Sequence, residues 1–138
     1  MGAELSGYRK LIAWERGLDL VDAVYDAVRF LPPDERFGLS TQMRRAAVSV
    51  PSNIAEGYCR QPRANVNHLG ISLGSAAELD TQVCVCLRRK FLSAEQTTPI
   101  LRLILEQRKI TYGLISSIER RFGLESTDSP PSTRRHPA

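Results

Sequence analysis

The side chains that could do chemistry are few, and the three cysteines are the first group to consider. Cys84 and Cys86 are separated by one residue, and Cys59 stands alone. On a helix this spacing places two side chains about 200° apart around the axis, so they cannot easily share a metal ion. We interpret both as small buried hydrophobic residues, and no pattern supports a reactive thiol at Cys59. An odd cysteine count without framework spacing indicates a reducing cytoplasm.

The acid–base residues form no catalytic constellation. His68 is the single histidine before the C-terminal segment, so a catalytic triad or a histidine-rich metal site is hard to build. Glu56 and Glu78 fall in two helices that we expect to touch. The favoured interpretation is that each carboxylate pairs with an arginine, and the alternative is that they act as general acids. The arginines in question are Arg44, Arg45 and Arg60. No glycine-rich loop follows a strand, so a phosphate-cradling motif is missing. We expect no enzymatic activity, no metal and no cofactor.

The basic residues are more informative, because they are unevenly distributed. Residues 41–90 hold seven Lys or Arg against three Asp or Glu, a net charge of +4, whereas residues 1–40 hold five against seven, a net charge of −2. Guanidinium groups suit phosphate oxygens, and each such contact releases counterions. A solvated charged face is the plain alternative. The candidate nucleic-acid-binding residues are Arg44, Arg45, Arg60, Arg63, Arg88, Arg89 and Lys90.

Length and composition place the chain among single-domain globular proteins. It has 138 residues, of which 42% are hydrophobic and 25% charged, with a net charge of +4. We find neither a signal-peptide pattern nor a run of about 20 apolar residues that could span a bilayer. We therefore expect a cytoplasmic protein without a membrane partner.

One helix, expected over residues 39–60, organises the rest. Its apolar residues recur at helical spacing, and Ser40 or Thr41 could cap its start. Pro51 stands in its middle, where the missing N–H and the ring cost about 3 kcal/mol, so we expect a Pro-kinked helix packed firmly among others. Its apolar stripe comprises Leu39, Met43, Ala47, Val50, Ile54 and Tyr58.

Three further amphipathic helices are predicted around this one. The first covers residues 8–31 and is ended by Pro32-Pro33; Gly17 is a mild cost inside it. Asp34 and Glu35 suit the positive end of the next helix. The seam of the first helix is predicted to comprise Leu11, Trp14, Leu18, Val21, Tyr25 and Val28.

The third helix is expected over residues 63–90, and small residues at 70–77 should let the proline-containing helix approach closely. Its predicted stripe comprises Val66, Leu69, Leu73, Ala76, Leu79, Val83 and Leu87.

The fourth helix starts either at a capping box of Ser93 and Gln96 or at Thr98-Pro99. Its apolar face is wider than one bundle seam and suggests a second buried contact, as at a subunit interface; Leu114 could serve either contact. The face comprises Leu101, Ile104, Leu105, Ile110, Leu114, Ile115, Ile118 and Phe122.

The sequence thus predicts an all-α protein, an antiparallel up-down four-helix bundle. The expected division is an N-terminal extension over residues 1–7, the bundle over residues 8–122 and a disordered tail over residues 123–138, which is rich in Ser, Thr, Pro and Arg.

The stretch RRAAVSVPSNIAEG, residues 44–57, carries a family resemblance. It resembles the signature of the four-helix bundle proteins encoded by intervening sequences in bacterial 23S ribosomal RNA genes. It is equally similar to the accessory variability determinant proteins of diversity-generating retroelements. Trp14, Pro32 and residues 35–39, 73–75 and 78–79 agree as well, so the resemblance covers residues 11–118. The motif residues are Pro51, Asn53, Glu56, Gly57 and Glu78.

This resemblance implies a ring-shaped homopentamer and no known catalytic reaction. In the retroelement branch it also implies basic surfaces that hold nucleic acid, with a reverse transcriptase as a partner. Five copies of each basic patch would raise avidity without a new contact. The function we expect is a non-enzymatic nucleic-acid-binding oligomer. The alternative is an oligomeric scaffold that binds another protein, with arginines that only keep it soluble.

Overall fold

The computed structural model describes residues 7–125, and these form four α-helices with two short 3₁₀ helices and no strand. This confirms the predicted all-α fold class. Residues 1–6 of the expected extension (1–7) and residues 126–138 of the expected tail (123–138) lie outside the described residues. The elements are η1 (Gly7–Lys10), α1 (Ile12–Val28), η2 (Pro33–Glu35), α2 (Leu39–Tyr58), α3 (Pro62–Arg88) and α4 (Ala94–Phe122).

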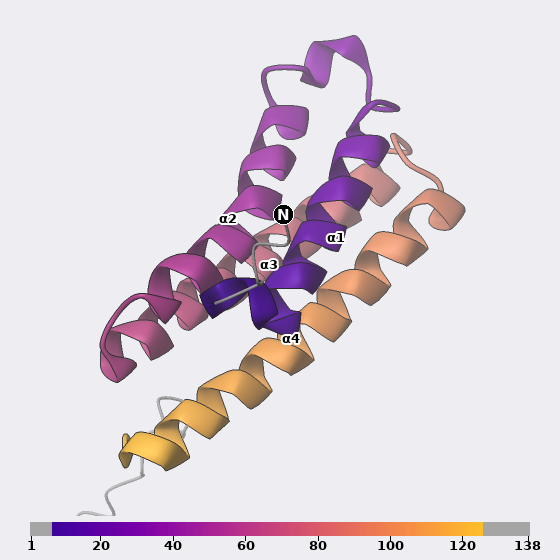
Figure 1. Ribbon diagram of the computed structural model, residues 1–138. Helices are drawn as coiled ribbons and strands as arrows, with labels where there is room; N and C mark the ends of the chain where they lie inside the picture. The colour runs from indigo at the N-terminus through magenta and orange to yellow at the C-terminus, as the bar shows by residue number, and fades with distance from the viewer. Residues whose placement is uncertain (1–6, 126–138) are drawn as a thin grey trace, which may run out of the picture.

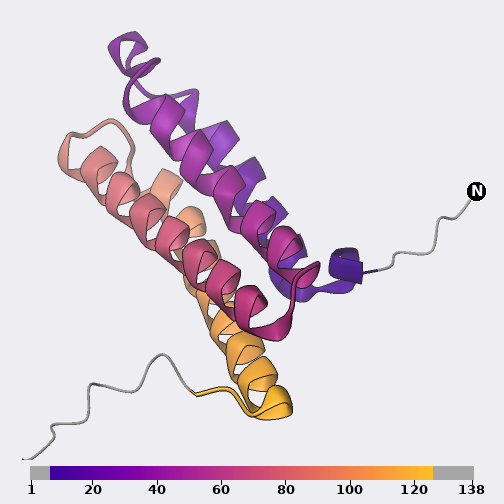
Figure 2. The same cartoon turned by 90° about the vertical axis from the view of Figure 1, so that its left-hand side faces the viewer.

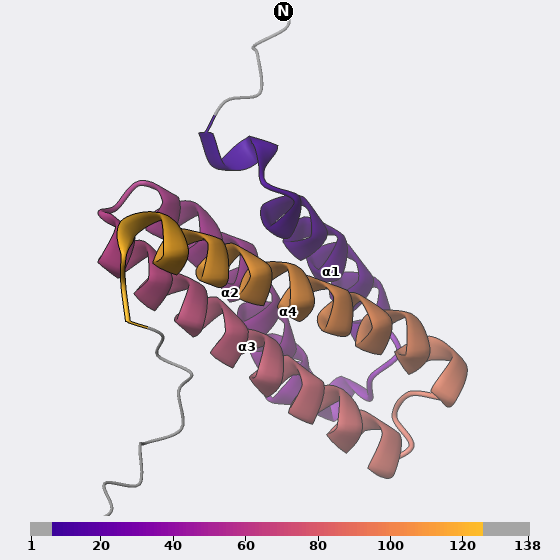
Figure 3. The same ribbon diagram turned by 90° about the horizontal axis from the view of Figure 1, so that it is seen from below.

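The four helices form an antiparallel up-and-down bundle (Figure 1). Each helix contacts the helices next to it in the chain, and α4 closes the bundle by contacting α1. α2 and α3 make the most extensive pair and lie side by side in Figure 2. Seen from below, α4 lies between α1 and α3 (Figure 3), and its last turns extend past the α2–α3 turn (Figures 1 and 2).

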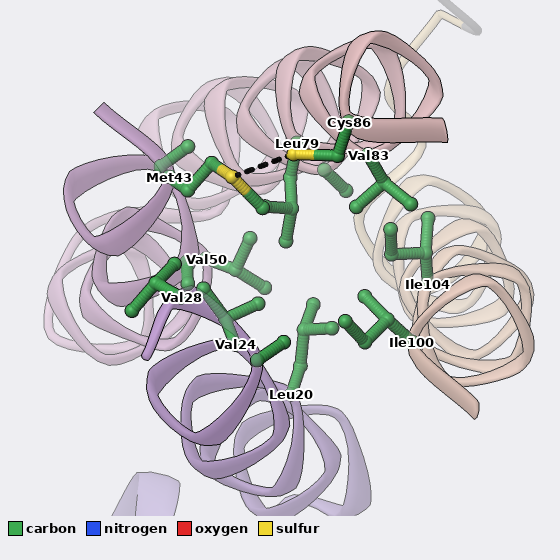
Figure 4. Packing of buried hydrophobic residues seen from close by; sticks show 14 of the residues in the cluster. Leu20, Val24, Val28, Met43, Val50, Leu79, Val83, Cys86, Ile100 and Ile104 are labelled. Atoms are coloured by element: carbon green, nitrogen blue, oxygen red, sulfur yellow. Dashed lines mark hydrogen bonds between the residues drawn. The ribbon is translucent and has the colours of Figure 1, made fainter. Parts of the chain in front are cut away.

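The core is built from all four helices, whose apolar side chains point toward a common centre (Figure 4). One end of the bundle, where the α1–α2 connection and the α3–α4 turn lie, is sealed by Leu31 after α1 and Leu92 before α4, which are both buried. The labelled core residues of Figure 4 are Leu20, Val24, Val28, Met43, Val50, Leu79, Val83, Cys86, Ile100 and Ile104.

The predicted stripe of α2 is largely correct. Met43, Ala47, Val50 and Ile54 are fully buried, whereas Tyr58 at the end of the helix is exposed. α2 continues through Pro51 as one unbroken helix.

Pro51 packs against α1, and Gly17 is the residue that makes room for it. A Cβ atom added at Gly17 would lie 3.0 Å from the Cβ of Pro51 and 3.3 Å from its Cα. Contacts this short would force the two helices apart. Gly17, expected only as a cost to helix stability, is thus the contact point between α1 and α2.

The predicted seam of α1 is partly correct: Val28 is buried, and Leu11, Trp14 and Val21 are partly buried against the core. Leu18 and Tyr25 are 39% and 45% exposed, and the buried face is shifted by about one residue. The reason is that Ala13 and Gly17 belong to this face, and small residues carry little weight in a hydrophobic pattern. The buried residues of α1 are Ala13, Gly17, Leu20, Val24, Ala27 and Val28.

The stripe of α3 is mostly confirmed. Val66, Leu69, Ala76, Leu79 and Val83 are buried, but Ser72 and Cys86 occupy core positions that we assigned to Leu73 and Leu87. The expected close approach of α2 depends on hydroxyl groups rather than on glycine.

Two short bonds join the helices at this point. The Ser72 hydroxyl donates to the Val50 carbonyl at 2.9 Å, and the Ser49 and Ser75 hydroxyls lie 2.8 Å apart. The predicted close approach at residues 70–77 is confirmed, but Gly70 and Gly74 take no part in it, because each has open space where a Cβ would stand.

Two helix starts differ in how well they were predicted. Neither Ser40 nor Thr41 caps α2; instead the Glu35 carboxylate, from η2, accepts the Leu39 N–H at 3.1 Å. Ser93 and Gln96 form the complete capping box of α4, so the helix begins there and not at Thr98-Pro99.

The wide apolar face of α4 is explained in part within one subunit, because α4 contacts both α1 and α3. Ile104 and Ile115 are buried. Leu101, Ile110, Leu114 and Ile118 are partly buried against the core. Leu105 and Phe122 are 55% and 50% exposed.

At the C-terminal end of α4, Gly123 adopts a left-handed conformation (φ 65°), and the Leu124 N–H donates to the Glu119 carbonyl. Residues 123–124 therefore terminate the helix rather than begin a tail.

Gly57 closes the packing of α2 on α3, and it gives a stability test with an internal control. A Cβ at Gly57 would lie 2.8 Å from the Cβ of His68, so Gly57→Ala must displace α3. Overpacking of this kind costs about 1–3 kcal/mol. Gly74→Ala, with open space around it in α3, should instead stabilise by about 0.5–1 kcal/mol through helix propensity.

Urea unfolding followed by circular dichroism measures both changes in the free energy of unfolding. Equal effects of the two substitutions would show that Gly57 is not a packing contact.

Candidate nucleic-acid interface

The family-like motif on α2 forms a polar network with α3. The Asn53 amide nitrogen donates to the Ser49 carbonyl at 2.9 Å and lies 3.0 Å from the Ser49 hydroxyl, which in turn contacts Ser75. On the other side Asn53 Oδ1 lies 3.2 Å from His68 Nδ1. Because Oδ1 can only accept, Nδ1 of His68 carries the proton.

This network assigns structural roles to most of the motif. Ser49, Asn53 and Gly57, spaced by four residues, face α3, while Pro51 faces α1. Sequence reasoning missed the network. The signal available was the set of small polar residues at four-residue spacing, away from the apolar stripe.

The two carboxylates considered as general acids do not share a site. The Glu56 carboxylate accepts from Arg60 at 3.2 Å on the exposed surface, which confirms the expected ion pair for this residue. Glu78 accepts from Gln82 at 3.4 Å and pairs with no arginine in residues 7–125. Measured from the Ser49–Ser75 contact, Glu56 lies toward one end of the bundle and Glu78 toward the other.

The cysteines take opposite environments. Cys86 is buried with its sulfur 3.7 Å from the Met43 sulfur, whereas Cys84 and Cys59 are exposed, so the prediction that Cys84 is buried is wrong. Residues two apart face opposite sides of a helix, and only one can enter the core. Burial raises the pKa of the Cys86 thiol to about 11, with a smaller contribution from the Glu35 carboxylate. Residues 7–125 contain no group of three or more His, Cys, Asp or Glu that could hold a metal ion.

The candidate basic residues fall into three separate groups. Arg60 and Arg63 stand at the α2–α3 turn. Arg44 and Arg45 lie on α2 beside a shallow groove that Tyr25 and Val48 also line. At a rise of about 1.5 Å per residue, Arg45 is about 22 Å from Arg60 along α2. These four arginines therefore lie on the second helix and the turn after it, but as two separate pairs.

The third group, Arg88 to Lys90, lies at the other end of α3, about 40 Å from the α2–α3 turn. The contact between Met43 and Cys86 brings this end of α3 next to the start of α2. The α1–α2 connector, residues 29–38, is therefore its neighbour.

Sequence reasoning missed this connector as a functional candidate. It adds the exposed cations Arg29 and Arg36 and two exposed aromatic side chains, Phe30 and Phe37. The Arg36 guanidinium lies 5.2 Å from the centre of the Phe37 ring. The available signal was the presence of two phenylalanines in a polar helix connection. We call the five cations Arg29, Arg36, Arg88, Arg89 and Lys90 the basic pole.

Most of the candidate cations lack a carboxylate partner. Of the seven, only Arg60 forms an ion pair within the described part of the chain. Arg44 is partly buried and donates to the Thr41 hydroxyl at 3.4 Å; the other six are exposed. Exposed, uncompensated cations are available to an external anion.

The sequence matches the family described as 23S rRNA-intervening sequence protein over residues 9–113, about three quarters of its length. The chain belongs to this family. The matched segment contains the motif of α2 and all seven candidate cations. No curated protein matches the sequence.

A solved relative supports the family assignment. The chain is similar to a protein of unknown function of the S23 ribosomal protein family from Bacteroides thetaiotaomicron VPI-5482. The two share 25% identity with a TM-score of 0.69, and the alignment covers 75% of this chain and 98% of that one. In this member of the intervening-sequence protein family, none of the helices within residues 7–125 has the length and apolar character needed to cross a membrane.

The raised pKa and the burial of the Cys86 thiol give a prediction for thiol labelling at pH 8. At pH 8 a thiol with a pKa of about 11 is deprotonated in about one molecule in a thousand, and the core also shields it. Iodoacetamide should therefore alkylate Cys59 and Cys84 of the folded protein and spare Cys86. In urea all three should react. Mass spectrometry of proteolytic peptides measures the extent, and equal native labelling of Cys84 and Cys86 would contradict the assigned orientation of α3.

Proposed function

We propose that this 23S rRNA-intervening sequence family protein is a non-enzymatic, oligomeric nucleic-acid-binding protein. It contacts RNA or DNA backbone through its basic groups. The observation that carries the proposal is that six of the seven candidate cations have no ion-pair partner among residues 7–125, although the chain has a near-balanced charge of 19 basic and 15 acidic residues.

Backbone contact with little sequence preference suits the arrangement of these groups. Arginine forks bind phosphate oxygens in a bidentate manner, and phosphate contacts position a nucleic acid without reading its sequence. The three groups are spread along the bundle, from the α2–α3 turn to the basic pole. A backbone that follows the bundle could contact more than one group.

The proposal includes no enzymatic activity because the acid–base side chains have other partners and lie apart from one another. His68 is held by Asn53, Glu56 is paired with Arg60, and Glu78 lies away from both. General acid–base catalysis requires such groups to converge on one reacting atom.

Assembly into a homo-oligomer is the second part of the proposal. Leu105 and Tyr112 stand seven residues apart on α4 and are 55% and 40% exposed. They continue the partly buried Leu101 along one flank of the helix. Such a stripe suits burial against a second copy. The pentameric ring is taken from the family resemblance, and it would present five copies of each basic group.

The resemblance to the accessory variability determinant proteins adds a reverse transcriptase as a proposed partner of the nucleic-acid complex. In the competing function, an oligomeric scaffold, the apolar stripe of α4 binds another protein instead of a second copy, and the cations only keep the protein soluble. Salt separates the two functions, because contacts to phosphate weaken steeply with ionic strength and apolar contacts do not.

Charge reversal on α2 tests the nucleic-acid function. The double substitution Arg44→Glu with Arg45→Glu should weaken binding of labelled RNA hairpins, single strands and DNA duplexes in 50 mM salt. It should also reduce the slope of log K against log salt by about 1 for each lost phosphate contact. Fluorescence anisotropy between 50 and 200 mM salt measures both, and circular dichroism checks the fold.

The matched control is Arg120→Glu with Arg121→Glu, an adjacent exposed pair near the end of α4 with the same change in charge. It should leave the slope unchanged. Equal losses in the two double variants would reduce the effect to net charge, and failure of the native protein to bind any of the probes at 50 mM salt would discard the function.

Oligomer formation is tested by light scattering. The native protein should form an assembly larger than a dimer at micromolar concentration. Leu105→Glu with Tyr112→Glu should dissociate it without unfolding the subunit, since both side chains are exposed in the subunit. Val85→Glu, at a similarly exposed apolar residue on α3, should not. A native monomer would contradict the proposal, and dissociation by Val85→Glu alone would place the interface on α3.

A further inference from the structure

We infer that the basic pole is a binding site for unpaired nucleotides, with Phe30 and Phe37 as stacking surfaces and the five cations as contacts for the flanking phosphates. The inference rests on the proposed nucleic-acid function. It goes beyond that function by naming the class of ligand, single-stranded segments rather than duplex, and by assigning a site outside the predicted set.

The exposure of the two aromatic rings is the first observation. Phe37 is 87% exposed and Phe30 is 65% exposed, the highest values of any large hydrophobic residue in the described chain. Burial of such a side chain would be worth about 1.5–3 kcal/mol, so leaving both in water forgoes a substantial stabilisation. The core does not need them, because Leu31 and Leu92 seal this end of the bundle.

Charge complementarity is the second observation. The α1–α2 connector and the α3–α4 turn bring five exposed cations to the same end of the bundle. The connector also carries two acidic residues, Asp34, which is exposed, and Glu35, whose carboxylate accepts the Leu39 N–H at the start of α2. Of the five cations, none forms an ion pair within residues 7–125.

The third observation is a contact between one of these cations and one of the exposed rings. The Arg36 guanidinium lies over the Phe37 ring, 5.2 Å from its centre. This cation–π contact holds a guanidinium group, which can bind phosphate, beside an exposed aromatic ring. A nucleotide presents the matching pair of groups, a flat base and a phosphate one sugar away.

Unpaired bases fit this arrangement and paired bases do not. In a duplex both faces of an interior base are covered by its neighbours, so an exposed ring can stack only on a base that is splayed out or terminal. Stacking on aromatic side chains accepts every base, which agrees with contact to the backbone without sequence preference.

Substitutions at residue 37 test the inference in the full-length protein. Phe37→Ala combined with Phe30→Ala should weaken binding of a labelled 12-nucleotide single strand by at least about 30-fold, as expected for the loss of stacking on two bases. Affinity for a duplex of the same sequence should be unchanged, and so should the salt slope, because no phosphate contact is removed. RNA and DNA versions of the strand distinguish the two sources of the ligand.

Two single variants separate stacking from general apolar contact. Phe37→Tyr keeps an aromatic face and should bind like the native protein. Phe37→Leu keeps apolar area without a ring and should bind more weakly, as Phe37→Ala does. If Phe37→Leu binds as well as the native protein, the ring is an apolar contact and stacking is excluded.

Two further outcomes are decisive. If the native protein binds no strand at 50 mM salt, the nucleic-acid function itself fails. If it binds and the phenylalanine variants bind equally well, the proposed function stands and this inference is wrong. All these residues are exposed, so circular dichroism should show a native fold in every variant.

Discussion

The contact of Pro51 with Gly17 is the constraint on which the rest of the bundle depends. Pro51 offers no N–H to the helix, and its ring occupies space that an ordinary residue would leave free, which in an unsupported helix costs about 3 kcal/mol. Gly17 leaves that space open on α1. On the other side of α2, the Ser72 hydroxyl bonds to the carbonyl that precedes the proline. The proline is therefore tolerated because α2 is held from two directions, and those contacts fix how α1 and α3 are rotated around it.

These demands account for the motif of α2 as a folding signal. Its residues face three ways: Pro51 toward α1, Val50 and Ile54 into the core, and Ser49, Asn53 and Gly57 toward α3. The most recognisable part of the sequence is thus occupied by contacts within the subunit. Apart from Arg44 and Arg45 at the start of the motif, the groups available for contact with other molecules are found elsewhere, at the helix connections and on the uncovered flank of α4.

The fold could be predicted where large apolar residues mark a face, as on α2 and α3, and not where small residues make the contact, as at Ala13 and Gly17. At the start of α2 the prediction that Glu35 suits the positive end of the helix is confirmed, but the capping role given to Ser40 or Thr41 is wrong because Glu35, from a separate 3₁₀ turn, accepts the Leu39 N–H. For the candidate interface, the sequence supplied the cations but not their neighbours. Arg45 on α2 and Arg60 in the turn after it lie far apart, whereas Arg36 and Arg88 are distant in sequence and lie at the same end of the bundle because antiparallel helices return to that end.

Two simpler explanations, solubility and docking of an apolar protein surface, each account for only part of the basic pole and its two phenylalanines. Solubility accounts for exposed cations but not for Phe30 and Phe37, which would lower it. Docking of an apolar protein surface accounts for the phenylalanines, yet it would bury five unpaired cations at a considerable cost in desolvation. A ligand that is flat and apolar in one part and anionic in the next satisfies both sets of groups together. Among biological polymers, a strand of unpaired nucleotides has this alternation at every residue.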